Sequence, residues 1–91
     1  MYAVKPTGRF AGDLRRAEKR GCRIELLTEL VKQLASGAVP EKRYRDHPLK
    51  GSYADCRECH VLPDWLLVYE IDKEAGILYL TRTGTHSDLF R

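Results

Sequence analysis

The stretch WLLVYEIDKEAGILYLTR, residues 65–82, decides the fold of this 91-residue chain. It begins with an apolar run of strand length and ends with a second one, both with β-branched and aromatic side chains. Between them, the polar residues and glycine of DKEAG at 72–76 are typical of a hairpin loop. We therefore predict two antiparallel strands, at 65–71 and 77–82.

The residues before this hairpin extend the sheet. Residues 55–62 alternate in part between polar and apolar side chains, and Pro63-Asp64 marks a turn. These features predict a third strand, so that the C-terminal part forms an antiparallel three-stranded meander. A short β-prone segment at residues 2–5 could add an edge strand.

The N-terminal part has helical periodicity. Residues 8–20 carry apolar side chains at helical spacing behind Thr7, a potential N-cap, and residues 22–36 carry a wider apolar stripe that Ser36-Gly37 ends. The side chains of these two stripes are Phe10, Leu14 and Ala17, then Ile24, Leu27, Val31 and Leu34. Helices first and strands later predict an α+β fold of one domain, residues 1–91, with a helical hairpin packed on a small antiparallel sheet.

Charge is distributed unevenly along the chain. Residues 1–57 contain 13 Lys and Arg against 7 Asp and Glu, whereas residues 58–91 contain 3 against 6. This asymmetry favours polyanion binding through the first part of the chain, notably by the basic first helix and the run at 42–45. We expect a cytoplasmic protein that does not contact membranes, because no apolar run could span a bilayer or serve as a signal peptide. Three cysteines in such a chain make a disulfide framework improbable.

Three histidines, His47, His60 and His86, suggest acid–base chemistry, because imidazole titrates near neutral pH. On a strand at 55–62, Glu58 and His60 would point to one face and Arg57 to the other. On the last strand, Leu78, Leu80 and Arg82 would share a face. In a suitable register, the sheet would carry a polar patch of Glu58, His60 and Arg82.

Two alternatives involve cofactors. Residues 56–60 match the C-x-x-C-H pattern of c-type haem attachment, but no export signal precedes them and they lie in a predicted strand. Cys56 and Cys59 would point to opposite faces of that strand, which argues against a zinc half-site. A metal site made by the three histidines and Asp64 is geometrically possible. We nevertheless expect no metal and no other cofactor.

Three motifs in the C-terminal half point to a known family. They are D-H-x-L-x-G from Asp46, R-[DE]-x-H-[VI]-x-P-D from Arg57, and R-x-G-[ST]-H-x-x-L-F from Arg82. Together they resemble the YafQ-type toxins of the RelE superfamily, over about residues 44–90. The resemblance implies a microbial-ribonuclease-like sheet with two N-terminal helices. It also implies a toxin that cuts mRNA in the ribosomal A site and is neutralised by a cognate antitoxin.

The same resemblance assigns site residues. The positions that match residues important for activity in the family are His47, His60, Asp64, His86 and Phe90. Glu58 stands where the family pattern has aspartate, and Arg82 matches an arginine that fits phosphate binding. The expected substrate-binding residues are Lys50, Arg57 and Phe90.

This set of residues suggests cleavage through the ribose 2′-OH. Our hypothesis is that His47 or His60 removes the hydroxyl proton, His86 protonates the departing 5′-oxygen, and Arg82 stabilises charge on the phosphate. Glu58 and Asp64 would orient the imidazoles and favour their cations. The expected partners are mRNA on the ribosome, ribosomal RNA and an antitoxin. Two rival hypotheses remain: a relative that binds RNA or the ribosome without cutting it, and a protein-interaction module of the same fold.

Overall fold

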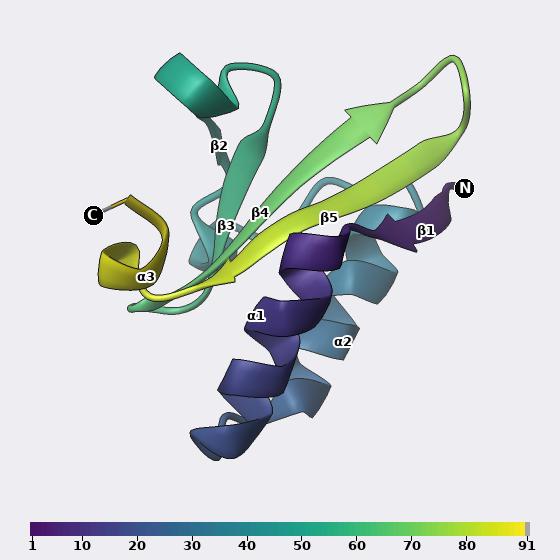
Figure 1. The fold of residues 1–91 in the computed structure, drawn as a ribbon. Coiled ribbons are helices and arrows are strands. Elements are labelled where there is room, and N and C mark those ends of the chain that lie inside the picture. Colours follow the sequence, from purple (N-terminus) through teal and green to yellow (C-terminus); the bar gives the residue numbers. More distant parts are fainter. Residues whose placement is uncertain (91) are drawn as a thin grey trace.

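The computed structural model describes residues 1–90 of the chain (Figure 1). Within this range, strand β1 (Ala3–Pro6) precedes two helices, α1 (Gly8–Lys19) and α2 (Ile24–Ala35). Strand β2 (His47–Pro48) lies between two short 3-10 turns, Lys42–Tyr44 and Gly51–Tyr53. The chain then forms β3 (Arg57–Leu62), β4 (Trp65–Asp72), β5 (Ile77–Gly84) and the short helix α3 (His86–Phe90). No helix within residues 1–90 has the length and apolar character needed to cross a bilayer.

The strands form one sheet in the order β1-β5-β4-β3-β2. Strands β2 to β5 pair in antiparallel fashion, whereas β1 pairs with β5 in parallel. The α+β class, the helical hairpin and the three-stranded meander are therefore confirmed, and residues 3–6 do form an edge strand. Strand β2 and helix α3 are additions that the sequence analysis did not predict.

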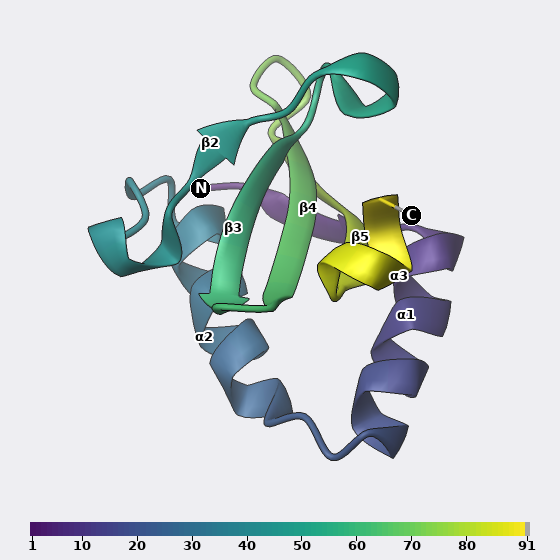
Figure 2. The same cartoon turned by 90° about the vertical axis from the view of Figure 1, so that its left-hand side faces the viewer.

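Both long helices cover the same face of the sheet (Figures 1 and 2). Thr7 caps α1 as predicted, because its hydroxyl accepts a hydrogen bond of 3.1 Å from the Phe10 N–H. The core between the layers includes Leu30 of α2, Leu67 of β4 and Leu78 of β5, all fully buried. Burial of each such side chain stabilises the fold by about 2 kcal/mol.

The opposite face of the sheet carries a smaller apolar cluster. Leu66 and Val68 of β4 pack there with Cys56, and Leu89 of α3 covers them. Helix α3 lies beside the end of β5 on this face (Figure 2). This arrangement brings the C-terminal residues back toward the middle strands.

An extra residue in β5 changes the face to which Arg82 belongs. Tyr69 of β4 pairs with Leu80 of β5. The residue before it in β4, Val68, pairs with Arg82 and not with Thr81, so Thr81 is the extra residue. Directly paired residues share a face, and one extra residue inverts the alternation. The prediction that Arg82 shares a face with Leu80 is therefore wrong. Arg82 instead shares the face of Val68 and of its β3 partner, Glu58.

A buried ion pair fixes this part of β5 to α1. The Arg82 Nε and Nη2 atoms donate to Asp13 at 2.6 and 3.1 Å, and the Thr83 N–H donates to the same carboxylate at 3.1 Å. Asp13 is 7% exposed and Arg82 is 8% exposed. Arg16 adds a second cation at 3.1 Å from Asp13. The carboxylate is thus fully engaged, and it connects the first helix to the last strand.

Replacing Asp13 by alanine should lower the free energy of unfolding by about 3 kcal/mol, because a buried guanidinium would lose its partner. Urea denaturation followed by circular dichroism measures this change. Glu74→Ala, in the exposed turn after β4, is the control and should change stability by less than about 0.5 kcal/mol. Equal stability of Asp13→Ala and the wild type would show that the ion pair does not hold α1 to the sheet.

Candidate active site

The three histidines lie in one row of rings. His60 stands in the middle, with its ring centroid 6.0 Å from that of His47 and 5.9 Å from that of His86. The row continues from His86 to Phe90 at 6.2 Å, and from Phe90 to Tyr53, edge to face, at 5.8 Å. These rings come from β2, β3, α3 and the 51–53 turn. The structure therefore brings together the histidines that the sequence analysis singled out.

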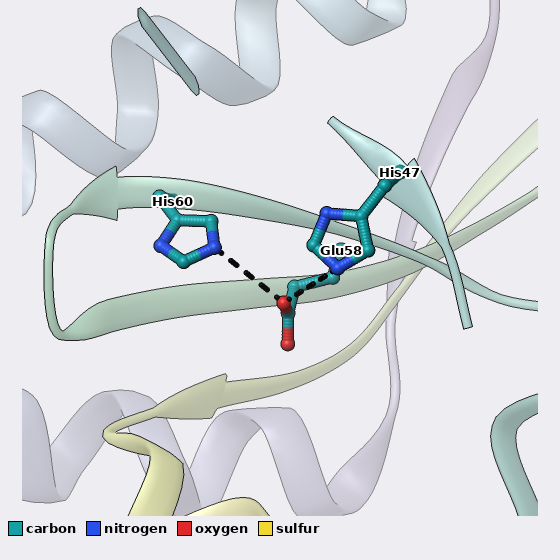
Figure 3. Close-up of side chains that lie close together, drawn as sticks. All are labelled: His47, Glu58 and His60. Atoms are coloured by element: carbon teal, nitrogen blue, oxygen red, sulfur yellow. Dashed lines mark ion pairs between the residues drawn. The ribbon is translucent and has the colours of Figure 1, made fainter. Parts of the chain in front are cut away.

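Glu58 lies between two of these rings (Figure 3). It is 4% exposed, and its Oε2 atom is 3.0 Å from the His47 Nε2 and 3.6 Å from the His60 Nε2. Within residues 1–90, its Oε1 atom has no hydrogen-bond partner. Buried polar atoms almost always have partners, so an unpaired oxygen here points to a functional role.

The other ring nitrogens define where protons can move. The His47 Nδ1 is 2.7 Å from the Arg45 carbonyl oxygen, and the His60 Nδ1 is 3.3 Å from that of Pro63. A carbonyl oxygen only accepts, so both Nδ1 atoms donate. The exchangeable positions are then the two Nε2 atoms that face Glu58. The three side chains form one cluster around the Glu58 carboxylate.

Asp64 orients the third histidine. Its Oδ1 atom is 3.1 Å from the His86 Nδ1 and also accepts the His86 backbone N–H at 3.2 Å. These two hydrogen bonds lower the pKa of Asp64. Because Asp64 holds Nδ1, the Nε2 atom of His86 is left for chemistry. The ring is more than half exposed and can meet a substrate.

Arg82 lies behind the row. The hydrogen bond to Asp13 raises the pKa of its guanidinium, and Tyr53 adds to this effect, so Arg82 remains a cation. Tyr53 also packs edge to face against Phe90. The sequence analysis did not predict a role for Tyr53, because a half-buried tyrosine in a turn-rich segment is indistinguishable from packing.

The two remaining basic residues of the predicted site are placed differently. Lys50 is exposed just before the 51–53 turn, near the row. Arg57 donates to Asp46 through Nε and Nη2 at 3.0 and 2.9 Å, and it pairs across the sheet with Tyr69, on the helix-covered face. Arg57 therefore points away from Glu58 and His60 and does not join the histidine row.

Asp46 is a supporting residue that the sequence analysis quoted without assigning a role. Burial raises its pKa, but hydrogen bonds from Arg57 and from the Tyr69 hydroxyl outweigh this effect and lower the pKa overall. The carboxylate is therefore charged and anchored to two strands. Since it directly precedes His47, it fixes the segment that carries this ring.

Asp88 supports the other end of the row. It accepts hydrogen bonds from Arg20 at 2.7 and 3.2 Å and from the Thr85 N–H at 2.9 Å, while its own N–H donates to the Thr85 hydroxyl. This reciprocal pair is a capping box, which the spacing of Thr85 and Asp88 could have indicated. A Cβ atom at Gly84 would lie 2.8 Å from the Asp88 carboxylate, so only glycine fits there.

The Glu58 cluster has the donors of a metal site. Among residues 1–90, one ligand atom each from His47, Glu58 and His60 lie within 4.8 Å of one another. Two imidazoles and a carboxylate are ligands that Zn²⁺ and related ions accept. This group does not include His86 or Asp64, so it differs from the metal site considered from the sequence. A metal ion bound here would lie between the Glu58 carboxylate and the two imidazoles.

Comparison with known proteins decides the family. Residues 2–91 match the family described as "Bacterial toxin of type II toxin-antitoxin system, YafQ". The chain belongs to the YafQ toxin family. It is 36% identical over 88 residues to the "mRNA interferase toxin YafQ" of Escherichia coli K12, with 96% of this chain and 94% of that protein covered. The resemblance proposed from the three motifs is thus confirmed.

Solved structures of bacterial toxins share the whole fold. The crystal structure of YafQ from E. coli BL21(DE3) superposes with a TM-score of 0.92 at 34% identity, covering all of both chains. A chain from the E. coli DinJ–YafQ complex, also fully covered, gives 0.91 at 35% identity. A metal-bound toxin from Helicobacter pylori gives 0.93 at 43% identity, covering 99% of this chain and 100% of that one.

The lowered pKa of Asp88 makes the anchoring of α3 depend on pH. Its main cause is the hydrogen bond from Arg20. A carboxyl whose folded-state pKa is depressed stabilises the fold above its unfolded pKa, about 3.9, and loses this contribution as pH falls through the folded-state value. Asp88→Asn should therefore unfold at lower urea concentration than the wild type at pH 7. The difference should shrink steadily below about pH 4. A gap that stays constant down to pH 2 would contradict the assignment.

Proposed function

We propose that this YafQ-family toxin is a ribosome-dependent endoribonuclease that cleaves mRNA in the ribosomal A site by metal-independent acid–base catalysis. The observation that carries the proposal is the histidine row with a buried, half-paired carboxylate in its middle. The name of the E. coli relative, mRNA interferase toxin, supports the same reaction. The E. coli DinJ–YafQ complex supports neutralisation by a cognate antitoxin.

The first chemical step uses the Glu58 cluster as the base. The ribose 2′-oxygen loses its proton to the Nε2 of His47 or His60, and Glu58 stabilises the resulting imidazolium. The 2′-oxygen then forms a bond to the adjacent phosphorus. Both imidazoles face the same carboxylate oxygen, so the base can be either ring.

The second part of the reaction uses His86 as the acid. As the bond from phosphorus to the 5′-oxygen breaks, the His86 Nε2 donates its proton to that oxygen. Asp64 holds the ring at Nδ1 and so directs Nε2 outward. The products are a 2′,3′-cyclic phosphate and a 5′-hydroxyl. Arg82, a buried cation whose charge is offset in part by Asp13, is the residue proposed to stabilise the charge that grows on the phosphate.

Two residues contribute to RNA binding in this scheme. Phe90 is 43% exposed at the end of the row and can stack on a nucleobase of any type. Lys50 is exposed near the row and can contact a backbone phosphate. The basic side chains of α1 would face ribosomal RNA, so ribosome binding should weaken with added salt. An action on ribosomes places the toxin in the cytoplasm.

Replacing His86 by alanine should reduce the rate of cleavage of ribosome-bound mRNA by about 100-fold or more, because the departing oxygen would lose its acid. Single-turnover cleavage on programmed ribosomes measures the rate, and pull-down with ribosomes measures binding, which should persist. The wild type should show a bell-shaped pH–rate profile, and His86→Ala should lose its alkaline limb. Undiminished cleavage by His86→Ala would remove this residue from the acid role.

The two rival hypotheses make different predictions for growth. Expression of the wild type without an antitoxin should stop growth, and His86→Ala should relieve the arrest. Equal toxicity of both proteins would favour an RNA- or ribosome-binding relative that does not cut, and absence of toxicity would favour a protein-interaction module.

Metal independence has its own test. Cleavage should persist when a zinc-selective chelator is added while Mg²⁺ keeps the ribosomes intact. Added Zn²⁺ should inhibit, since occupation of the Glu58 cluster would remove the base. Loss of cleavage with the chelator, restored by Zn²⁺, would overturn the metal-independent mechanism.

A further inference from the structure

A cavity of about 240 Å³ adjoins the histidine row at His60. Its walls come from the 42–44 turn and from the end of β3 with the turn that follows; the lining residues are Arg43, Tyr44, Arg45, His60, Val61, Leu62 and Pro63. The 42–44 turn and α3, which carries Phe90, lie on opposite sides of β3 and β4 (Figure 2). The cavity and Phe90 therefore flank the row from two sides.

Two arginines make this cavity positive. The Arg43 guanidinium lies 4.5 Å from the ring centroid of the buried Tyr44, and its Nη2 is 2.7 Å from the Tyr44 hydroxyl oxygen, so its position is fixed. Glu41 offsets part of its charge at 3.3 Å. Arg45 is exposed, and within residues 1–90 no carboxylate lies within 4.0 Å of its guanidinium. The wall thus presents at least one uncompensated cation.

The backbone at Arg45 is unusual. Its φ of 51° and ψ of 42° place it in the left-handed region, and it is the one non-glycine residue with positive φ among residues 1–90. Such a conformation costs roughly 1–2 kcal/mol and is enriched at functional sites. In this conformation the Arg45 carbonyl oxygen accepts a hydrogen bond from the His47 Nδ1–H, and Arg45 also lines the cavity. One residue therefore couples the base cluster to the cavity wall.

We propose that this cavity is a subsite for a phosphodiester group of the RNA next to the scissile one, with Arg45 and Arg43 as its cationic ligands. The inference rests on the proposed function. Guanidinium groups bind phosphate oxygens through paired N–H donors, and the apolar side chains of Val61, Leu62 and Pro63 offer contact to the attached ribose. With Phe90 on the other side of the row, the RNA strand would be held on both sides of the bond that breaks.

The test uses the full chain and a fluorescein-labelled RNA oligonucleotide carrying 2′-O-methyl groups throughout, which cannot be cleaved through the 2′-oxygen. Arg45→Asn removes the charge, and asparagine tolerates the left-handed backbone, so the carbonyl contact to His47 is kept. Arg45→Lys retains the charge. Lys73→Ala removes one charge in the turn between β4 and β5, at the far end of the hairpin from α3 (Figure 1).

Fluorescence anisotropy across a salt series should show that Arg45→Asn binds the oligonucleotide about tenfold more weakly than the wild type. The slope of log affinity against log salt should fall by about 0.7, the value for one lost phosphate contact on a single strand. Arg45→Lys should restore most of both quantities, and Lys73→Ala should match the wild type. On programmed ribosomes, Arg45→Asn should raise KM more than it lowers kcat.

Unchanged affinity and salt slope in Arg45→Asn would overturn the subsite even if the wild type cleaves mRNA. The subsite would also be overturned if Arg45→Asn and Lys73→Ala weakened binding by the same factor, because a nonspecific effect of charge would then explain both losses. Should Arg45→Asn fail to fold by circular dichroism, Arg43→Gln decides the question by the same criteria. If the wild type does not cleave but Arg45→Asn binds RNA more weakly, the nuclease proposal fails while the phosphate subsite stands.

Discussion

The buried ion pair between Asp13 and Arg82 is the constraint on which the rest of the structure depends. It joins the first helix to the last strand at the point where an extra residue has turned Arg82 to the other face of the sheet. Helix α3 begins four residues later, so the placement of His86 and Phe90 follows from this anchor. Leaving either charge unpaired in the interior would be costly, and both residues are therefore committed to one geometry.

Each of the three histidines has a carboxylate or carbonyl that restricts it. Glu58 faces two imidazoles, Asp64 holds His86, and Asp88 fixes α3 to α1 through Arg20. Three acids thus lie where they orient imidazoles or guanidinium groups. The same restraint explains the geometry at His47, whose Nδ1 is held by a backbone carbonyl so that Nε2 is directed at Glu58. Pre-organisation of this kind lowers the cost of reaching a productive arrangement.

The sequence predicted the regular elements well and the short ones poorly. Helices at 8–20 and 22–36 and strands at 55–62, 65–71 and 77–82 correspond to observed elements, because periodicity over several turns or pleats is a strong local pattern. Strand β2 has two residues and α3 has five, so neither is long enough to show a period. The histidines and acidic residues of the site were predicted through motifs. Tyr53 and Arg45 were not, because no local pattern distinguishes them from ordinary packing or surface residues.

Local sequence by itself determined the α+β class, the helical hairpin, the meander and the chemical types in the site, since each depends on residues close together in the chain. Only the tertiary structure decided that Glu58 would sit between two histidines and that Arg82 would face Val68 and bind Asp13. The physical reason is register. Strand pairing and one inserted residue set which side chains meet, and these depend on packing between segments that lie 11 to 69 residues apart.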